Sequence, residues 1–394
     1  MSDEGQVKTR RQTTEDRGQT GWASRVPRPA SVICRLSSVV CRLSSVVWLL
    51  AAGGCSEEQG SGLGKDFSYD LAEFRKVDPS LVRYAEAGKI EPGLKEPRGL
   101  AVDANDRIYV AGDQAVAVFG PDPTPLPLRE GVGGGSGRGA GPGANPRPLA
   151  PAGAGDLSLK GRGVIQVGAP PRCLAVAADG TLYVGMKDHI EVFAPTGERR
   201  AAWPSLGEKA VLTSVAVSDE NVFAADAGNR AVVRYDLSGN VLGLIGKRDE
   251  ARNIAGFVIP SPHFDLALGR DGLLWVTNPG RHRLQAFTVD RGDLEASWGK
   301  AAVGIEGFSG CCNPTDFAFL PDGSFVTSEK GIPRVKVYSH EGKLEAVVAP
   351  PDAFDKDVVG LDLATDSKGR VLVLDPAAKC VRVFVKKGTT EKNP

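Results

Sequence analysis

The chain has 394 residues, of which 41% are hydrophobic and 24% charged, enough for one large folded domain or two ordinary ones. Its 48 basic and 48 acidic side chains balance, so no basic excess exists to displace counterions from phosphates, and we expect no nucleic-acid partner. Glycine (49) and proline (27) are abundant, which favours many turns over long helices.

Residues 1–30 are polar and show no periodic apolar pattern, so we expect a disordered leader or one translated from DNA upstream of the true start. The heptapeptide Cys34–Val40 is repeated without change as Cys41–Val47. Two heptads are too few for a stable coiled coil. We therefore interpret this duplication as translated repetitive DNA.

Residues 31–55 are typical of a signal peptide, because the apolar stretch Val46–Gly54 is far shorter than the roughly 20 residues that span a bilayer. Ala52–Cys55 resembles the cleavage box of bacterial lipoproteins, in which the cysteine is lipidated, although that box prefers leucine where Ala52 stands. The alternative is an ordinary secretory signal with an incidental Cys55. Both interpretations predict export to the bacterial cell envelope, facing the periplasm or the exterior, and lipidation would anchor the protein to the membrane. Residues 56–80 would form a tether.

A strand is expected at Leu81–Ala85, and six copies of a pattern of short alternating strands follow it. The first strands of the copies are anchored at Leu100, Leu174, Val215, Leu266, Phe317 and Leu361. The last four intervals are 41 to 51 residues, close to the ~40–50 of a four-stranded propeller blade.

The first interval is longer because residues 121–160 intervene, and 18 of these 40 are glycine or proline. Such a composition buries too little apolar surface to offset its ordering entropy, so we expect a disordered insertion. Residues 389–394 would form a short tail.

The last copy ends at its third strand, and the strand at 81–85 precedes the first copy. Pairing these two would close a ring and leave no open sheet edge. The sequence therefore predicts an all-β fold over residues 81–388. It would be a six-bladed β-propeller of four-stranded blades, closed by the N-terminal strand.

These copies resemble the NHL-repeat family of six-bladed propellers, whose blades are similar to Pro97–Asp103, Ile108–Val110 and Ala115–Phe119. The resemblance implies a binding platform more often than an enzyme, and we expect a monomer. The family's strand order would place the loops entering the inner strands, notably 250–263 and 300–315, on one face together with the exits of the second strands.

Asp226, Asn278, Glu329 and Asp375 stand at those exits, either as turn caps or as functional groups. We predict a binding face for an envelope protein or a small molecule. Its residues are His263, Asn278, Arg281, Phe308, Cys311, Cys312, Asn313 and Glu329.

Adjacent cysteines are uncommon, and Cys311 and Cys312 allow three interpretations. They could form a disulfide with each other, or pair separately with Cys173 and Cys380. They could instead act as thiolate ligands or as a redox pair. Export favours a structural disulfide.

Three carboxylates, Asp265, Asp316 and Asp362, lie at or near inner strands, and Asp362 is aligned with Ala101 and Ala318. Around a central channel they could bind a divalent cation through oxygen. The alternative is that they pair with arginines such as Arg98 or Arg334, or with backbone amides. No cofactor is otherwise implied.

We expect a binding protein rather than an enzyme. The competing interpretation is a lactonase or esterase that resembles the gluconolactonase-like propellers, with the three aspartates holding a divalent metal and His263 as general base. The glutamate and the Asn-Gly signature of that family have no matching positions in this chain.

Overall fold

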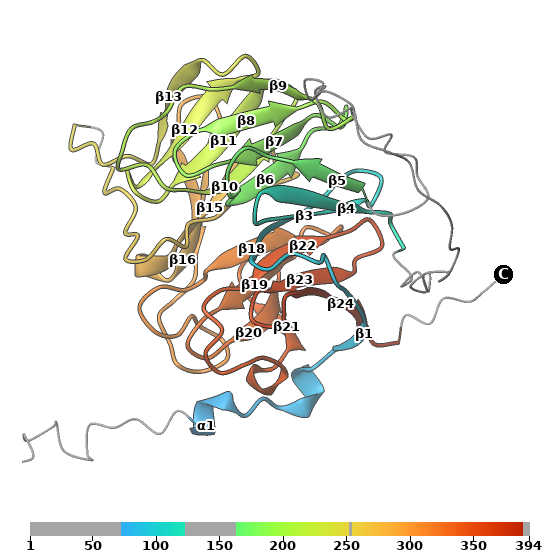
Figure 1. Ribbon diagram of the computed structural model, residues 1–394. Coiled ribbons are helices and arrows are strands. Elements are labelled where there is room, and N and C mark those ends of the chain that lie inside the picture. The colour runs from blue at the N-terminus through green and yellow to red at the C-terminus, as the bar shows by residue number, and fades with distance from the viewer. Residues whose placement is uncertain (1–71, 123–162, 252–253, 389–394) are drawn as a thin grey trace, which may run out of the picture. The chain divides into compact units, whose positions relative to one another are not determined.

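Short runs of alternating residues, each ended by a turn, form six antiparallel sheets of four strands in the computed structural model (Figure 1). The structure describes residues 72–122, 163–251 and 254–388, all of which belong to the unit Asp70–Pro394. The six first strands contact one another in sequence and surround a central channel. This arrangement confirms the predicted six-bladed β-propeller.

The strands of the first three blades, from the channel outward, have the following bounds. They are β2 (Pro97–Val102), β3 (Ile108–Gly112), β4 (Ala115–Phe119), β5 (Gly163–Gln166), β6 (Cys173–Val176), β7 (Leu182–Gly185), β8 (Ile190–Phe193), β9 (Arg199–Ala202), β10 (Leu212–Val217), β11 (Asn221–Asp226), β12 (Ala231–Asp236) and β13 (Val241–Ile245).

The last three blades continue in the same order. They are β14 (Leu266–Leu268), β15 (Leu274–Asn278), β16 (Arg283–Phe287), β17 (Leu294–Trp298), β18 (Asp316–Phe319), β19 (Phe325–Glu329), β20 (Arg334–Tyr338), β21 (Leu344–Ala349), β22 (Asp362–Thr365), β23 (Val371–Asp375), β24 (Cys380–Lys386) and β1 (Tyr84–Ile90).

Helical elements are short in the described part of the chain. They are α1 (Ala72–Arg75), η4 (Pro79–Leu81), η5 (Pro279–Arg281) and η6 (Pro351–Ala353). The guanidinium of Arg75 donates to the carbonyl of Pro351 at 3.2 Å, which joins the segment before β1 to the fifth blade's exit. Among the described residues, no helix is both long and apolar enough to cross a membrane.

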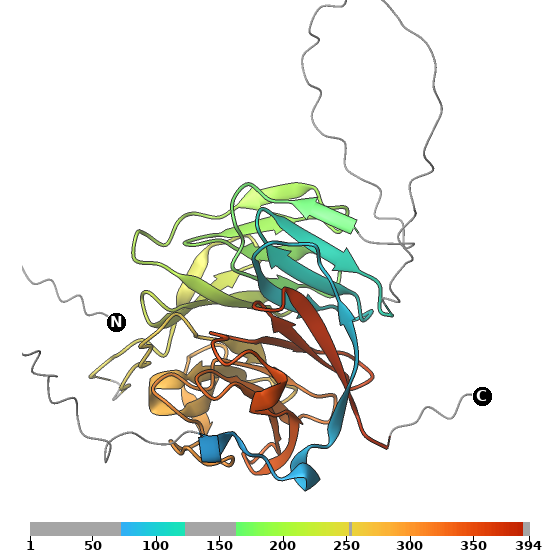
Figure 2. The same ribbon diagram turned by 60° about the horizontal axis from the view of Figure 1, so that its bottom comes forward.

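Strand β1 closes the ring by pairing antiparallel with β24, from Tyr84 opposite Lys386 to Ile90 opposite Val381 (Figure 2). The predicted closure is confirmed, but the predicted bounds of the closing strand were wrong. The Asp78 side chain accepts the backbone N–H of Ser80, and this cap starts the 3-10 turn η4, which takes up Leu81. The strand therefore begins three residues later than the pattern suggested.

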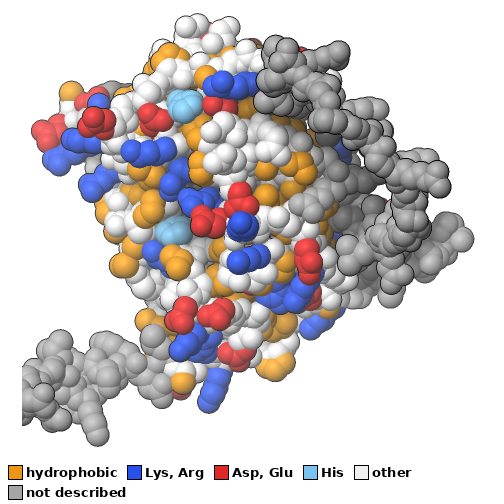
Figure 3. Space-filling view, in the orientation of Figure 1, with side chains coloured by type: hydrophobic (Ala, Val, Ile, Leu, Met, Phe, Trp, Pro, Cys, Tyr) orange, Lys and Arg blue, Asp and Glu red, His pale blue; other side chains and the backbone are white. Residues whose placement is uncertain are grey.

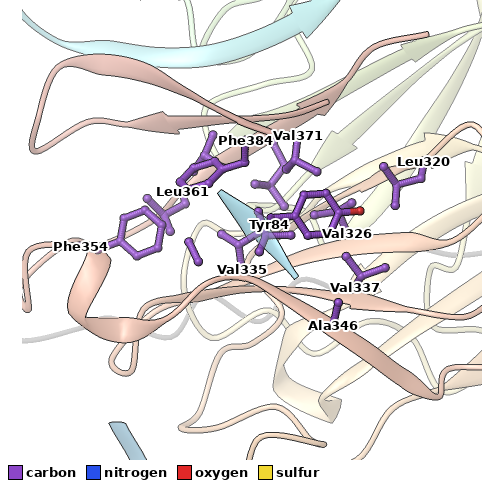
Figure 4. Close-up of a cluster of buried hydrophobic side chains, with 14 of the residues drawn as sticks. Tyr84, Leu320, Val326, Val335, Val337, Ala346, Phe354, Leu361, Val371 and Phe384 are labelled. Atoms are coloured by element: carbon purple, nitrogen blue, oxygen red, sulfur yellow. The ribbon is translucent and has the colours of Figure 1, made fainter. Parts of the chain in front are cut away.

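The core lies between neighbouring blades, where the sheets pack face to face. In Figure 4, the ring of Tyr84 lies among aliphatic side chains of β19 and β20, with Phe384 of β24 nearby. Tyr84 is only 4% exposed. Burial of such a side chain contributes roughly 1.5–3 kcal/mol, so the closing strand is joined to the ring by packing as well as by its backbone.

The alignment of the sixth copy was wrong by two residues. Asp362 pairs with Leu374 at the start of β22, as Asp316 pairs with Ser328 at the start of β18. Asp362 is therefore equivalent to Asp316 and not to Ala318. The apolar Leu361 before it is buried and was mistaken for the first strand residue.

Several predictions concern segments that lie wholly or mostly outside the described residues. These are the leader 1–30, the signal peptide 31–55 with Cys55, most of the tether 56–80, most of the insertion 121–160 and the tail 389–394. The described end of the tether contains α1 and the start of η4. The insertion connects β4 to β5, the third and fourth strands of the first blade.

Candidate functional site

Loops that enter the inner strands and loops that leave the second strands share one face, as the sequence predicted. The backbone N–H of Val258 donates to Asn278 Oδ1 at 3.0 Å, at the end of β15. Lys330, just after β19, donates through Nζ to Ser261 Oγ at 2.9 Å. These bonds hold the loop before β14 against the ends of β15 and β19 on one face of the ring.

The mouth of the channel on this face is a cavity of about 390 Å³. Its charged and titratable lining residues are Arg98, Arg172, His263, Asp265, Asp316 and Asp362. The channel interior, a further space of about 380 Å³ lined by the six inner strands, shares the three aspartates with the mouth. The aspartates therefore form the floor of the mouth and the entrance to the channel.

Each of the three aspartates accepts a backbone N–H from the inner strand of the next blade. Asp265 accepts from Phe317, Asp316 from Leu363 and Asp362 from Leu100, all at 2.9 Å. The alternative of pairing with backbone amides is thus confirmed. These carboxyl groups join four successive blades around the channel.

Burial raises the pKa of all three carboxyl groups, and repulsion between the charges raises those of Asp316 and Asp362 further. Desolvation raises the pKa of Asp265 to about 6, and desolvation together with the charge of Asp265 raises that of Asp362 to about 8. Desolvation and the charges of Asp265 and Asp362 raise the pKa of Asp316 well above its ordinary value. At neutral pH the cluster therefore holds protons and carries less than its full negative charge.

Binding of a divalent cation by this cluster stays a prediction. Within the described residues, no group of three or more His, Cys, Asp or Glu side chains is arranged to hold a metal ion. Asp265, Asp316 and Asp362 each use one carboxylate oxygen on a backbone amide, which leaves few oxygens free for a cation. We therefore derive no chemical step through a metal.

Two arginines stand at the mouth on the side of the first two blades. Arg172 is half-buried, its Nε donates to the carbonyl of Leu212 at 3.1 Å, and no described residue accepts from its two Nη groups. Desolvation lowers the pKa of Arg172, and the positive charge of Arg98 lowers it further. Arg98 is more exposed and pairs with Glu96 at 2.7 Å. Elsewhere, basic and acidic side chains are interspersed over the surface in view (Figure 3).

His263 lies in the wall of the mouth as a neutral ring. Desolvation lowers its pKa to about 4, and the nearby Lys330 charge lowers it further. A Cβ on Gly360 would come within 2.8 Å of His263 Cε1, so glycine is needed there for the ring to fit. Of the predicted site residues, His263 alone joins the aspartates in the lining of the mouth.

The predicted binding-face residues divide into an exposed and a buried group. Arg281 and Cys311 are exposed, while Asn278, Phe308, Cys312, Asn313 and Glu329 are buried. The side chain of Asn278 bonds Val258 and Gln285, and that of Asn313 bonds Ser309 and Lys330. The buried group supports the loops of this face, and its direct contact with a ligand stays a prediction.

Glu329 is part of a buried ion network beneath the loop that enters β18. Its Oε1 lies 2.7 Å from both Arg334 Nε and Lys336 Nζ, and all three side chains are at most 1% exposed. The suggestion that Arg98 or Arg334 pairs with the channel aspartates was therefore wrong. At the other exits, Asp226 accepts three backbone amides, and Asp375 accepts one, as turn caps do.

The four described cysteines, Cys173, Cys311, Cys312 and Cys380, are free thiols, so the structure does not contain the expected disulfide. The Sγ atoms of Cys311 and Cys312 lie 3.0 Å apart. Cys173 is buried in the core between the second and third blades, which leaves it no access to the surface loop that carries the pair.

Sequence reasoning missed Arg172 as a site residue and considered Arg98 only as a partner for aspartate. A signal was present, because Pro97–Leu100 and Pro171–Leu174 both place a Pro-Arg pair directly before the equivalent channel position. The repeat of an arginine at one position in neighbouring blades implies two guanidinium groups on the same side of the channel.

No protein-family model matches the sequence, and no curated protein matches it either. A solved gluconolactonase from Xanthomonas campestris is similar in fold, with a TM-score of 0.50 and 15% identity, over 79% of this chain and 93% of that one. A streptogramin B lyase gives a TM-score of 0.48 and 9% identity, over 79% of this chain and 100% of that one. The virginiamycin B lyase from Staphylococcus aureus gives a TM-score of 0.46 and 10% identity, over 74% of this chain and 81% of that one. The likeness to the gluconolactonase supports the propeller fold.

Proposed function

We propose that this NHL-type propeller is a binding protein that takes a small organic anion, such as a carboxylate, at the mouth of its channel. The observation that carries the proposal is the pair of arginines, Arg98 and Arg172, facing one cavity. Like charges brought together at a partly buried position repel each other, and a shared anion removes that repulsion. A planar guanidinium also matches the geometry of a carboxylate.

The charge balance of the mouth supports an anion over a cation. At neutral pH the pKa of about 8 leaves Asp362 largely protonated and His263 is neutral, while burial and the charges of Asp265 and Asp362 hold the pKa of Asp316 well above its usual value. Asp265, with a pKa of about 6, is largely ionised, and its negative charge faces the two positively charged guanidinium groups of Arg98 and Arg172. Glu96 offsets Arg98 only weakly, because their ion pair is exposed to solvent.

The dimensions and rigidity of the mouth also suit a small ligand. A volume of about 390 Å³ falls at the lower end of the range of small-molecule sites. The lining residues come from strands and from loops fixed by hydrogen bonds, so a ligand loses little binding energy in ordering them. An envelope protein that presents an acidic side chain would meet the same chemistry.

We further propose that the protein is exported and anchored by a lipid on Cys55, which the apolar stretch Val46–Gly54 and the box Ala52–Cys55 support. The propeller would then capture its ligand at the cell envelope. Substitution of Cys55 by alanine should move the protein from the membrane fraction to the soluble fraction. Retention of the variant in the membrane fraction would disprove lipid anchoring at this residue.

A hydrolase of lactones or esters is the second candidate, and the carboxyl groups favour it. The pKa values of Asp265, about 6, and Asp362, about 8, lie on either side of neutrality, as a base and an acid require. The gluconolactonase of similar fold shows that such a ring can carry this chemistry. Turnover of a lactone that is lost in Asp265→Asn would favour this candidate.

The test of the binding proposal is a thermal-shift screen of the full chain against acetate, malate, gluconate and citrate at constant ionic strength. A ligand that binds the folded state raises the melting temperature. We expect at least one carboxylate to do so, and Arg172→Ala to abolish the ligand-induced shift. Arg248→Ala is the control, because Arg248 is 72% exposed and forms an ion pair with the nearby Glu250.

Comparison of ligand-induced shifts, rather than melting temperatures, separates binding from any change in stability. Arg172→Lys should recover part of the shift, because lysine keeps the charge but not the planar fork. No stabilisation by any carboxylate, or equal shifts in Arg172→Ala and Arg248→Ala, would contradict the proposal.

A further inference from the structure

A pair of thiols, Cys311 and Cys312, stands at the end of the loop that enters β18, on the same face as the channel mouth. Cys311 is exposed, and Cys312 is only 3% exposed. Their Sγ atoms lie 3.0 Å apart, about 1 Å more than the ~2.05 Å of a disulfide bond. One thiol is therefore open to a solvent-borne reactant while the other lies directly behind it.

The chain on both sides of the two cysteines is fixed to the blade. Before them, Ser309 donates through N and Oγ to Glu329 Oε2 at 2.8 and 3.1 Å. After them, Asn313 donates through Nδ2 to the carbonyls of Ser309 and Lys330 at 2.6 and 3.0 Å, and its Oδ1 accepts the N–H of Lys330. The loop thus holds the sulfurs together without a covalent bond between them.

The surroundings of Cys312 favour its thiolate. Burial by itself raises the pKa of this thiol, but hydrogen bonds from Cys311 and Ser261 and the positive charge of Lys330 outweigh burial and lower the pKa. Lys330 is held at this position by its bond to Ser261 Oγ. Cys173 and Cys380 differ, because burial raises the pKa of both thiols.

We propose that Cys311 and Cys312 form a reversible dithiol site that is oxidised by small-molecule or protein disulfides. The hydrogen bond to Cys312 raises the pKa of Cys311, so the Cys312 thiolate first takes the Cys311 proton across their 3.0 Å contact. The exposed Cys311 sulfur then attacks one sulfur of the incoming disulfide and forms a mixed disulfide, and the released thiolate takes the proton back from Cys312 and leaves as a thiol. The Cys312 thiolate then attacks Cys311 Sγ, which forms the Cys311–Cys312 disulfide and releases the second thiol. The two cysteines lose two electrons and two protons, and the incoming disulfide is reduced to two thiols.

The ring formed by adjacent cysteines also predicts that the oxidised form is easily reduced. Strained disulfides have higher reduction potentials than structural ones, and they are the labile members of their class. The site would therefore exchange with its partner in both directions. This inference does not depend on a ligand at the channel mouth.

The test is redox titration of the full chain with mixtures of oxidised and reduced glutathione, followed by acid quenching, alkylation and peptide mass spectrometry. Residues 301–330 form one tryptic peptide, which contains Cys311 and Cys312 and separates them from the other cysteines. We expect this peptide to lose two hydrogen atoms and to carry no glutathione. Cys173 and Cys380 should remain reduced and serve as internal controls.

Single variants distinguish the two steps. Cys312→Ser should accumulate glutathione on Cys311, because the resolving thiol is absent. Cys311→Ser should react at least about tenfold more slowly, because Cys312 is buried. Phenylarsine oxide, which needs two neighbouring thiols, should bind the unmodified chain in a one-to-one ratio and neither variant.

Two results would overturn the proposal. One is a stable glutathione adduct on Cys311 in the unmodified chain, at the level seen in Cys312→Ser. The other is a peptide that stays fully reduced in oxidised glutathione alone, with no reduced glutathione added. Circular dichroism of each variant confirms that the ring is folded, so that neither result can be attributed to unfolding.

Discussion

One position at the start of each inner strand determines the chemistry of the channel. It is occupied by Gly99, Cys173, Ser214, Asp265, Asp316 and Asp362 in the six blades. The three aspartates accept backbone amides of the next blade, and Ser214 interacts with Leu266 in the same way. The carboxyl groups thus accept hydrogen bonds that connect neighbouring blades. All three are buried at the same end of the channel, and this burial raises their pKa values.

The raised pKa of Asp362 predicts how stability depends on pH. A carboxyl group with a pKa of about 8 in the folded protein, against 3.8 ordinarily, binds its proton more tightly when folded. Its contribution to stability is fully present below pH ~4 and is lost as pH rises through about 8. The negative charge of Asp265 raises the pKa of Asp362 after desolvation and so adds to the loss, whereas burial raises the pKa of the neighbouring Cys173 thiol.

Asp362→Asn keeps an oxygen acceptor for Leu100 and removes the titration. Between pH 6 and pH 9, the free energy of unfolding should fall less in this variant than in the unmodified chain, by on the order of 1 kcal/mol or more. Urea denaturation at several pH values measures this change in the free energy of unfolding. Asp352→Asn, at a side chain that is 83% exposed, is the control, and parallel curves for all three proteins would contradict the assignment.

At the scale of elements, the loop 299–315 depends on charged residues that the pattern places in solvent. The alternation in β20 predicts that Arg334 and Lys336 face outward, yet the loop covers them. Lys336 Nζ donates to the carbonyls of Ile305 and Gly307 at 3.0 and 2.7 Å, and Glu329 compensates both cations. The alternation of residues predicts on which side of a strand each side chain lies. It does not predict whether a loop from elsewhere in the chain covers that side.

Loss of the carboxylate in Glu329→Gln leaves two buried cations without compensation. The variant should lose about 3–5 kcal/mol of stability. Glu306→Gln is the matched control in the same loop, because Glu306 forms an exposed ion pair with Lys300 at 3.2 Å, and its loss should cost less than about 1 kcal/mol. Denaturant unfolding compares the two, and equal costs would contradict a role for Glu329 in holding the loop.

At the scale of the whole molecule, the sequence predicts the ring better than it predicts the site. Repeat spacing is sufficient for the blades, because each blade is a local unit whose turns and alternation are visible in the chain. The closing strand was also predictable, since a truncated last copy needs a partner. The bounds of the closing strand could not be predicted, because the cap at Asp78 starts a 3-10 turn in residues whose sequence also suits a strand.

The site was only partly predictable because it depends on residues from different blades. His263 and the three aspartates were identified as candidates, and all four line the channel mouth. Asn278 and Glu329 were expected at a surface, but long loops bury them. The pairing of Arg98 with Arg172 requires the ring itself, which brings together residues that are 74 positions apart.

The most direct test of the central claim is a crystal structure of the full chain with a brominated carboxylate related to the one that stabilises it best. The anomalous signal of bromine locates the ligand without reliance on its shape. The account predicts a bromine peak in the mouth cavity and the carboxylate between Arg98 and Arg172. A peak elsewhere on the ring, or an empty mouth at a concentration that saturates the protein in solution, would contradict it.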